Sequence, residues 1–130
     1  MRFILIFIFI LNASNLISGE VNSWECYEFE GAKIIGGDGE FLGTLGPAWQ
    51  TESIFNDSSS YASTWSQNSI FNTSSKYGNS WSNLSVFNES ASNPPMIIGD
   101  SGIVGYLSIG PSWQSDRYSP YDIKYTCDWD

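Results

Sequence analysis

Tryptophan recurs at one position of a serial repeat, and it is the residue type in this chain best suited to ligand binding. Trp49, Trp65 and Trp81 stand 16 residues apart, and Tyr61 and Tyr77 follow the first two at a fixed offset. A tryptophan face binds the apolar side of a pyranose ring, while neighbouring Asn, Ser and Asp side chains can bind its hydroxyl groups. These aromatics are therefore candidates for a shallow sugar site. The alternative is that a regularly repeated aromatic packs inside its own unit.

The repeat that carries these residues has three units. The units begin WQTESIFN, WSQNSIFN and WSNLSVFN, and a serine follows each final asparagine by two positions. The third unit ends at Asn93, where Pro94 and Pro95 stop regular backbone hydrogen bonding. A unit this short cannot bury its aromatic face alone, so we expect the units to stack or to pack on flanking elements and to form an aromatic core.

Four asparagines of this region stand in N-x-S triplets, which accept N-linked glycans in a eukaryotic secretory pathway. They are Asn56, Asn72, Asn83 and Asn88. Three of these triplets arise from the repeat itself, and Asn and Ser side chains commonly bond to nearby backbone groups in tight turns. We therefore expect turn-forming asparagines.

A β-hairpin with a Gly/Asp turn is predicted on each side of the repeats. The two hairpins cover residues 34–45 and 97–107, and each is followed by the motif G-P-[AS]-W-Q. The alternating run 122–127 predicts a last strand, which would pair with residues 24–29. Serine, asparagine and glycine are abundant, and no window keeps helical spacing for more than a turn. The fold class is therefore mainly β with much turn and coil.

The N-terminus has the form of a removable signal helix. A run of nine apolar residues, Phe3–Leu11, follows Met1 and Arg2, and it is shorter than the roughly 18 residues that a permanent membrane helix needs. Cleavage near Gly19 would assign residues 1–19 to the signal peptide and residues 20–130 to a single domain. We therefore expect a secreted or periplasmic protein with no stable membrane anchor after cleavage.

Cys26 and Cys127 are the only cysteines, and they lie near the two ends of the predicted domain. An oxidising compartment would join them, and no C-x-x-C spacing favours a redox or metal site. The bridge would close a loop of about 100 residues, for which the chain-entropy model gives a stabilisation of about 4–5 kcal/mol. We expect a structural disulfide.

Charge and composition exclude several functions. The chain has 14 acidic and 5 basic residues, a net charge of −9 and no histidine. Without histidine there is no Ser/His or Cys/His catalytic pair and no H-E-x-x-H zinc site. The acidic balance argues against nucleic acid and anionic membranes as partners. The Gly/Asp turns lack the ligand spacing of an EF-hand, so neither a metal nor another cofactor is expected.

A hydrolase would have to rely on two carboxylates about 5–10 Å apart. The candidate pairs are Glu28 with Glu30, on one face of the predicted first strand, and Asp38 with Asp100, in equivalent turns. Solvated surface charge explains all four, and no G-x-S-x-G motif is present. The sequence therefore assigns no catalytic residue.

The order of motifs resembles a group of small secreted bacterial proteins of unknown function. The repeats of that group usually read Y-G-x-Y-G-S-x-Y-S-x-x-S-I-W-N, with a G-x-L hairpin on each side. The resemblance covers residues 34–107, and this chain differs in using Trp where Tyr is common, in residues 57–60 and in its terminal cysteines. It implies a secreted repeat domain and no particular activity.

These observations favour a disulfide-closed, non-enzymatic module that binds a glycan or another cell-surface component through the repeat aromatics. The alternatives are a structural protein of an envelope or matrix and a carboxylate-based glycoside hydrolase. Burial or exposure of the tryptophans is the observation that bears most directly on the first two.

Overall fold

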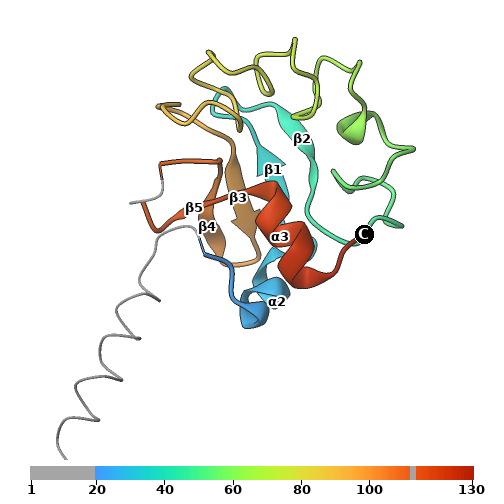
Figure 1. Cartoon of the computed structure of the whole chain (residues 1–130). Helices are drawn as coiled ribbons and strands as arrows, with labels where there is room; N and C mark the ends of the chain where they lie inside the picture. The colour runs from blue at the N-terminus through green and yellow to red at the C-terminus, as the bar shows by residue number, and fades with distance from the viewer. Residues whose placement is uncertain (1–19, 112–113) are drawn as a thin grey trace, which may run out of the picture.

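One five-stranded sheet organises the molecule (Figure 1). The computed structural model describes residues 20–111 and 114–130, so the predicted signal helix lies outside the described residues. The strands are β1 (Lys33–Ile35), β2 (Phe41–Thr44), β3 (Met96–Gly99), β4 (Gly102–Leu107) and β5 (Arg117–Tyr118). Their order is β2-β1-β3-β4-β5, and only the β4–β5 pair is parallel. Within the described ranges, no helix is long and apolar enough to cross a membrane.

Both predicted hairpins are confirmed, and they lie side by side through pairing of β1 with β3. Ile34 pairs with Ile97 at the centre of the sheet, and both side chains are fully buried. Gly39, in the first turn, and Gly102, where the second turn meets β4, have φ of 91° and 118°. Glycine reaches this left-handed region without the steric cost of a Cβ atom, which is why these turns use it.

The two strands predicted at the ends of the domain are wrong, because these segments are helical. Residues 24–29 lie in the 3-10 turn η1 (Ser23–Glu25) and α2 (Cys26–Phe29), and residues 122–127 lie in α3 (Pro120–Cys127). The Ser119 hydroxyl caps α3 by accepting from the Tyr121 N–H, and Pro120 occupies its first turn. Over six residues with one buried apolar side chain, Ile123, helical and strand periods cannot be told apart.

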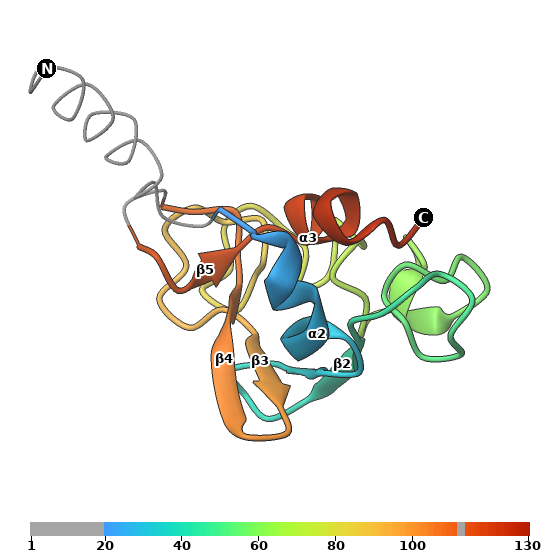
Figure 2. The same cartoon turned by 90° about the horizontal axis from the view of Figure 1, so that it is seen from below.

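The predicted disulfide is confirmed, and it joins the two terminal helices. Cys26 of α2 is bonded to Cys127 at the end of α3, with 5.6 Å between their Cα atoms. It closes a sequence separation of 101 residues, which fixes α3 beside α2 (Figure 2).

The repeats form an arch of turns that returns to the sheet region at both ends (Figure 1). At the first end, the Ile54 N–H donates to the Thr44 carbonyl of β2 at 2.9 Å. At the other end, the Ile109 N–H donates to the Val86 carbonyl at 3.0 Å, just beyond β4. The arch is therefore anchored at both ends to the segments it connects.

The core is mostly aliphatic, so the expectation of an aromatic core is wrong. Its largest fully buried side chains include Ile34, Leu42, Leu45, Ile54, Ile70, Val86, Ile97, Leu107 and Ile123, together with Phe29 and Tyr77. The repeats contribute Ile54, Ile70 and Val86, each five residues after a tryptophan. Each unit thus directs its aliphatic residue, rather than its tryptophan, into the core.

Candidate functional site

Each repeat unit is held by the same side-chain hydrogen bonds. In the second unit, Asn72 Oδ1 accepts from the Ser74 N–H, and its Nδ2 donates to the Ser66 carbonyl. Asn56 and Asn88 make the two equivalent bonds in their own units. These bonds satisfy backbone groups that have no strand partner, so the three asparagines are turn-forming residues.

The three tryptophans lie in solvent. Trp49, Trp65 and Trp81 are 78%, 89% and 85% exposed. The chain is fixed at two of them by equivalent bonds, because the Trp65 N–H donates to Ser63 Oγ and the Trp81 N–H donates to Asn79 Oδ1. The alternative that the repeated tryptophan packs inside its unit is therefore wrong.

The two tyrosines do not share the exposure of these three tryptophans, which we call the tryptophan row for their regular spacing in the sequence. Tyr61 is half-buried and packs edge-to-face on Phe41 of β2, with 5.2 Å between ring centroids. It also lies against Gly43, whose φ is 106° and where a Cβ atom would lie 2.9 Å from Tyr61 Cβ. Tyr77 is 1% exposed, and its hydroxyl donates to Asp38 Oδ2 at 2.8 Å. The structure thus places both tyrosines where the arch is anchored to the β1–β2 hairpin.

Asp38 and Tyr77 hold each other in fixed protonation states. Burial raises the pKa of Asp38, but hydrogen bonds from Tyr77, Lys76 and the Glu40 N–H, with the charge of Lys76, together lower it by more, so it lies below its usual value. Burial raises the pKa of Tyr77, and the hydrogen bond to the Asp38 carboxylate raises it further. A neutral phenol and a charged carboxylate therefore form an anchor between the arch and the turn.

Two hollows lie between α3 and the arch, and the repeat makes them equivalent. The first hollow, of about 300 Å³, is lined by Ile54, Phe55, Asp57, Ala62, Thr64, Phe71, Tyr121 and Lys124. The second hollow, of about 480 Å³, is lined by Ile70, Phe71, Thr73, Gly78, Ser80, Trp81, Phe87 and Tyr121. Every repeat residue of the first hollow has its counterpart, 16 positions later, in the second. Phe71 and Tyr121 belong to both.

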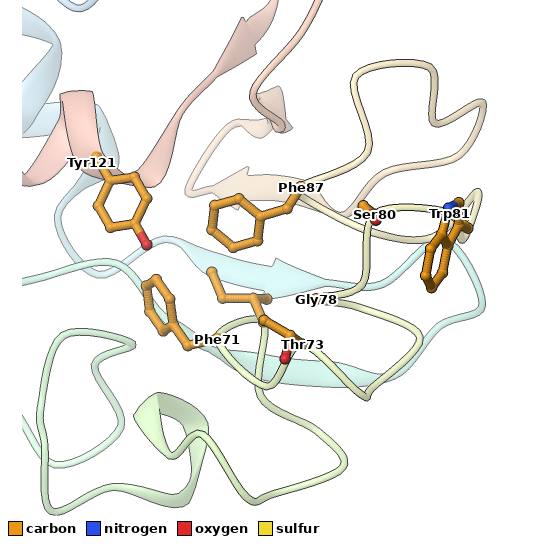
Figure 3. A pocket seen from close by; sticks show the side chains of 8 residues that line it. Phe71, Thr73, Gly78, Ser80, Trp81, Phe87 and Tyr121 are labelled. Carbon is orange, nitrogen blue, oxygen red and sulfur yellow. The ribbon is translucent and has the colours of Figure 1, made fainter.

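Aromatic rings close one end of the second hollow (Figure 3). The ring centroids of Phe71, Phe87 and Tyr121 lie between 5.8 and 6.1 Å apart. Trp81 stands at the opposite end, with Ser80 beside it, and Thr73 and Gly78 lie between the two ends. Apolar walls with a few hydroxyl groups are typical of small-molecule sites.

The carboxylates considered for hydrolysis lie apart from these hollows. Glu28 is in α2 and Glu30 directly follows it, which corrects their placement on a strand. Asp38 forms the anchor with Tyr77, Asp100 is exposed in the β3–β4 turn, and none of the four lines either hollow. Among the described residues, no group of three or more His, Cys, Asp or Glu could hold a metal ion.

Sequence reasoning missed the Phe residues and Tyr121. Phe55, Phe71 and Phe87 recur as regularly as the tryptophans, so the repeat itself held their signal. Tyr121 could not be found in this way, because its segment was expected to be extended and its contacts cross from α3 to the arch.

Comparison with protein-family models, curated proteins and solved structures gives no match for this chain. Its function is therefore argued from the site alone.

Proposed function

We propose that this protein is a secreted, non-enzymatic module that binds glycans through Trp49, Trp65 and Trp81. The observation that carries the proposal is the exposure of tryptophan at the same position in all three units, while the aliphatic residue of each unit is buried. The domain thus keeps three of its largest side chains in water rather than in the core.

Exposed tryptophans at one position of a repeat suit a sugar ligand for two reasons. The ring faces offer large apolar surfaces that gain free energy when a pyranose face covers them. Asn, Ser and Thr side chains are abundant between the tryptophans and can bind hydroxyl groups. A small disulfide-bonded domain also fits an extracytoplasmic setting, where glycans are available.

Retention on immobilised polysaccharides tests the proposal. The variant is Trp65→Ala with Trp81→Ala, and the matched control is Trp24→Ala, which removes an exposed tryptophan of η1 outside the row. The panel is cellulose, chitin, β-1,3-glucan, xylan, mannan and polygalacturonate. We expect the wild type and the control to be retained equally and the double variant to lose at least tenfold in affinity.

Three other results would overturn the proposal. If the double variant is retained as well as the wild type, the tryptophan row does not take part in binding. No retention of the wild type on any polymer would favour a structural envelope or matrix protein. Release of soluble sugars, abolished by changing one Asp or Glu, would identify a hydrolase instead.

A further inference from the structure

We infer that the first and second hollows are tandem subsites for successive units of one neutral linear polysaccharide, with Tyr121 contributing to both. The inference rests on the proposed function and extends it to a ligand class and to residues outside the tryptophan row. It is carried by the equivalence of the two hollows.

The equivalence favours a ligand that is itself a repeat. A group that fits the first hollow meets similar residues at the same relative positions in the second, since Phe55, Ala62 and Thr64 are matched by Phe71, Gly78 and Ser80, although Thr73 replaces the charged Asp57. The hollows share Phe71 as a wall, so they adjoin. A linear polymer of identical units can fill both without a break, whereas a single small molecule uses only one.

The charges of the hollows and of the whole chain favour an uncharged polymer as the ligand. The second hollow has no charged side chain among its lining residues, and the first has Asp57 and Lys124, whose charges are opposite. The whole chain carries −9, so a polyanion approaching either hollow would be repelled. A neutral sugar needs only apolar faces and hydroxyl partners.

The lining has the chemistry that a pyranose requires. The clustered rings of Phe71, Phe87 and Tyr121 provide an apolar wall, and the hydroxyls of Thr73 and Ser80 lie at the exposed part of the second hollow (Figure 3). Tyr121 lines both hollows because its ring lies 6.0 Å from that of Phe71, the repeat residue that the hollows share.

Two matched blocking variants test the inference. Thr64→Arg and Ser80→Arg place the same long side chain at equivalent exposed positions, one in each hollow. Titration calorimetry is carried out with oligosaccharides of increasing length, cut from the neutral polymer of the panel that retains the protein best. Far-UV circular dichroism and Tm confirm that each variant is folded.

For short oligosaccharides we expect two sites in the wild type and one in each single variant. For long oligosaccharides we expect each single variant to lose about 100-fold in affinity, because linked units bind the second subsite intramolecularly. Both blocks together should abolish binding of short oligosaccharides at these two sites. Tyr121→Ala should weaken both sites, while Tyr125→Ala, one turn along α3 and outside both hollows, should leave them unchanged.

Failure of the subsites and failure of the proposed function give different results. If Thr64→Arg and Ser80→Arg bind like the wild type while loss of Trp65 and Trp81 abolishes retention, the subsites are wrong and the proposed function stands. Tighter retention on polygalacturonate than on the neutral polymers would overturn the ligand class. No retention of the wild type at all would overturn the proposed function and this inference together.

Discussion

The hydroxyl of Tyr77 donates a 2.8 Å hydrogen bond to Oδ2 of Asp38, a residue 39 positions earlier in the chain. The bond joins the second repeat unit to the turn between β1 and β2. Lys76 Nζ lies 3.1 Å from the same carboxylate oxygen, but its side chain is 60% exposed, so that ion pair contributes little. The buried phenol therefore makes a polar contact that helps to position the arch over this turn, where Asn68 and Asn93 add exposed hydrogen bonds to Glu40 and Gly37.

Asp38→Ala is expected to destabilise the protein by about 2 kcal/mol, because it leaves the buried Tyr77 hydroxyl without its acceptor. Tyr77→Phe should destabilise the protein less, because it removes the buried hydroxyl itself and leaves no donor without an acceptor. The loss of stability in the double variant should then be smaller than the sum of the losses in the two single variants. Urea unfolding measures all three, and strictly additive losses would contradict the anchor.

Acid should weaken the same anchor. The pKa of Asp38 is lower in the folded chain than its ordinary value of 3.8, so the unfolded chain binds the proton more readily. The stabilisation is therefore present above about pH 4 and is lost as the pH falls through the lowered pKa. Thermal unfolding between neutral and acid pH should show this loss, and Asp38→Asn should reduce it. If Asp38→Asn loses as much stability in acid as the wild type does, other carboxylates cause the loss.

A second phenol predicts a loss of stability in alkali. The Tyr118 hydroxyl donates to Glu25 Oε2 at 3.1 Å, and burial, followed by the charge of Glu25, raises the pKa of Tyr118 to about 12. Because this folded-state pKa exceeds the ordinary value of 10.0, the stabilisation is complete below pH 10 and is lost as the pH rises through about 12. Tyr118→Phe should flatten the decline of Tm over this range, and Tyr125→Phe, whose ring is exposed, is the control.

The sequence predicted what depends on local signals. The hairpins followed from Gly/Asp turns between apolar runs, and the disulfide followed from two cysteines in one predicted domain. The helix α3 was missed because only Ile123 of its middle section is buried, so the segment has no apolar stripe. Its Ser119-Pro120 start was the available signal.

The exposure of the tryptophans could not be predicted from their spacing. A repeat places equivalent residues in equivalent surroundings, but it does not tell which residue of the unit faces the sheet. That choice is decided by the space between the sheet and the arch, which Ile54, Ile70 and Val86 fill. The hollows could not be predicted from the sequence either, because Tyr121 lines them from α3, a helix that lies after the second hairpin.

Tryptophan fluorescence should report this arrangement directly. Trp24, Trp49, Trp65 and Trp81 are exposed, whereas Trp129 is 5% exposed in the core. We expect most of the emission to be red-shifted and quenched by acrylamide, a neutral quencher suited to an acidic protein. Trp129→Phe should remove a blue-shifted, protected component. Emission that is mostly blue-shifted and protected would contradict the exposed row.

Reduction of the disulfide should lower the free energy of unfolding by about 4–5 kcal/mol, the chain-entropy value for a closed loop of this length. The effect should be large because α3 has only eight residues and is too short to be stable alone. Guanidinium unfolding with and without a thiol reductant measures it. The Cys26→Ala and Cys127→Ala double variant should match the reduced protein, and a loss below about 1 kcal/mol would contradict the prediction.

Substitution of two successive N-x-S asparagines should change stability to very different extents. Asn72 is buried and makes two hydrogen bonds through its side chain, so Asn72→Ala should cost about 2–3 kcal/mol. Asn83 is exposed, and within the described residues only its backbone carbonyl takes part in a hydrogen bond, accepting from the Asn93 N–H. Asn83→Ala should therefore change stability by less than about 0.5 kcal/mol. Urea unfolding of the two variants compares them.

The same contrast predicts which triplet can carry a glycan. A sugar on Nδ2 of Asn56, Asn72 or Asn88 would replace one of its two hydrogens and crowd the bond that Nδ2 donates to the backbone, and at the buried Asn72 it would have no room. On Asn83 it would extend into solvent. When the chain is expressed through a eukaryotic secretory pathway, peptide mapping of the folded, secreted product should find occupancy at Asn83 alone. A folded product glycosylated at Asn72 would show that the turn does not need that side chain.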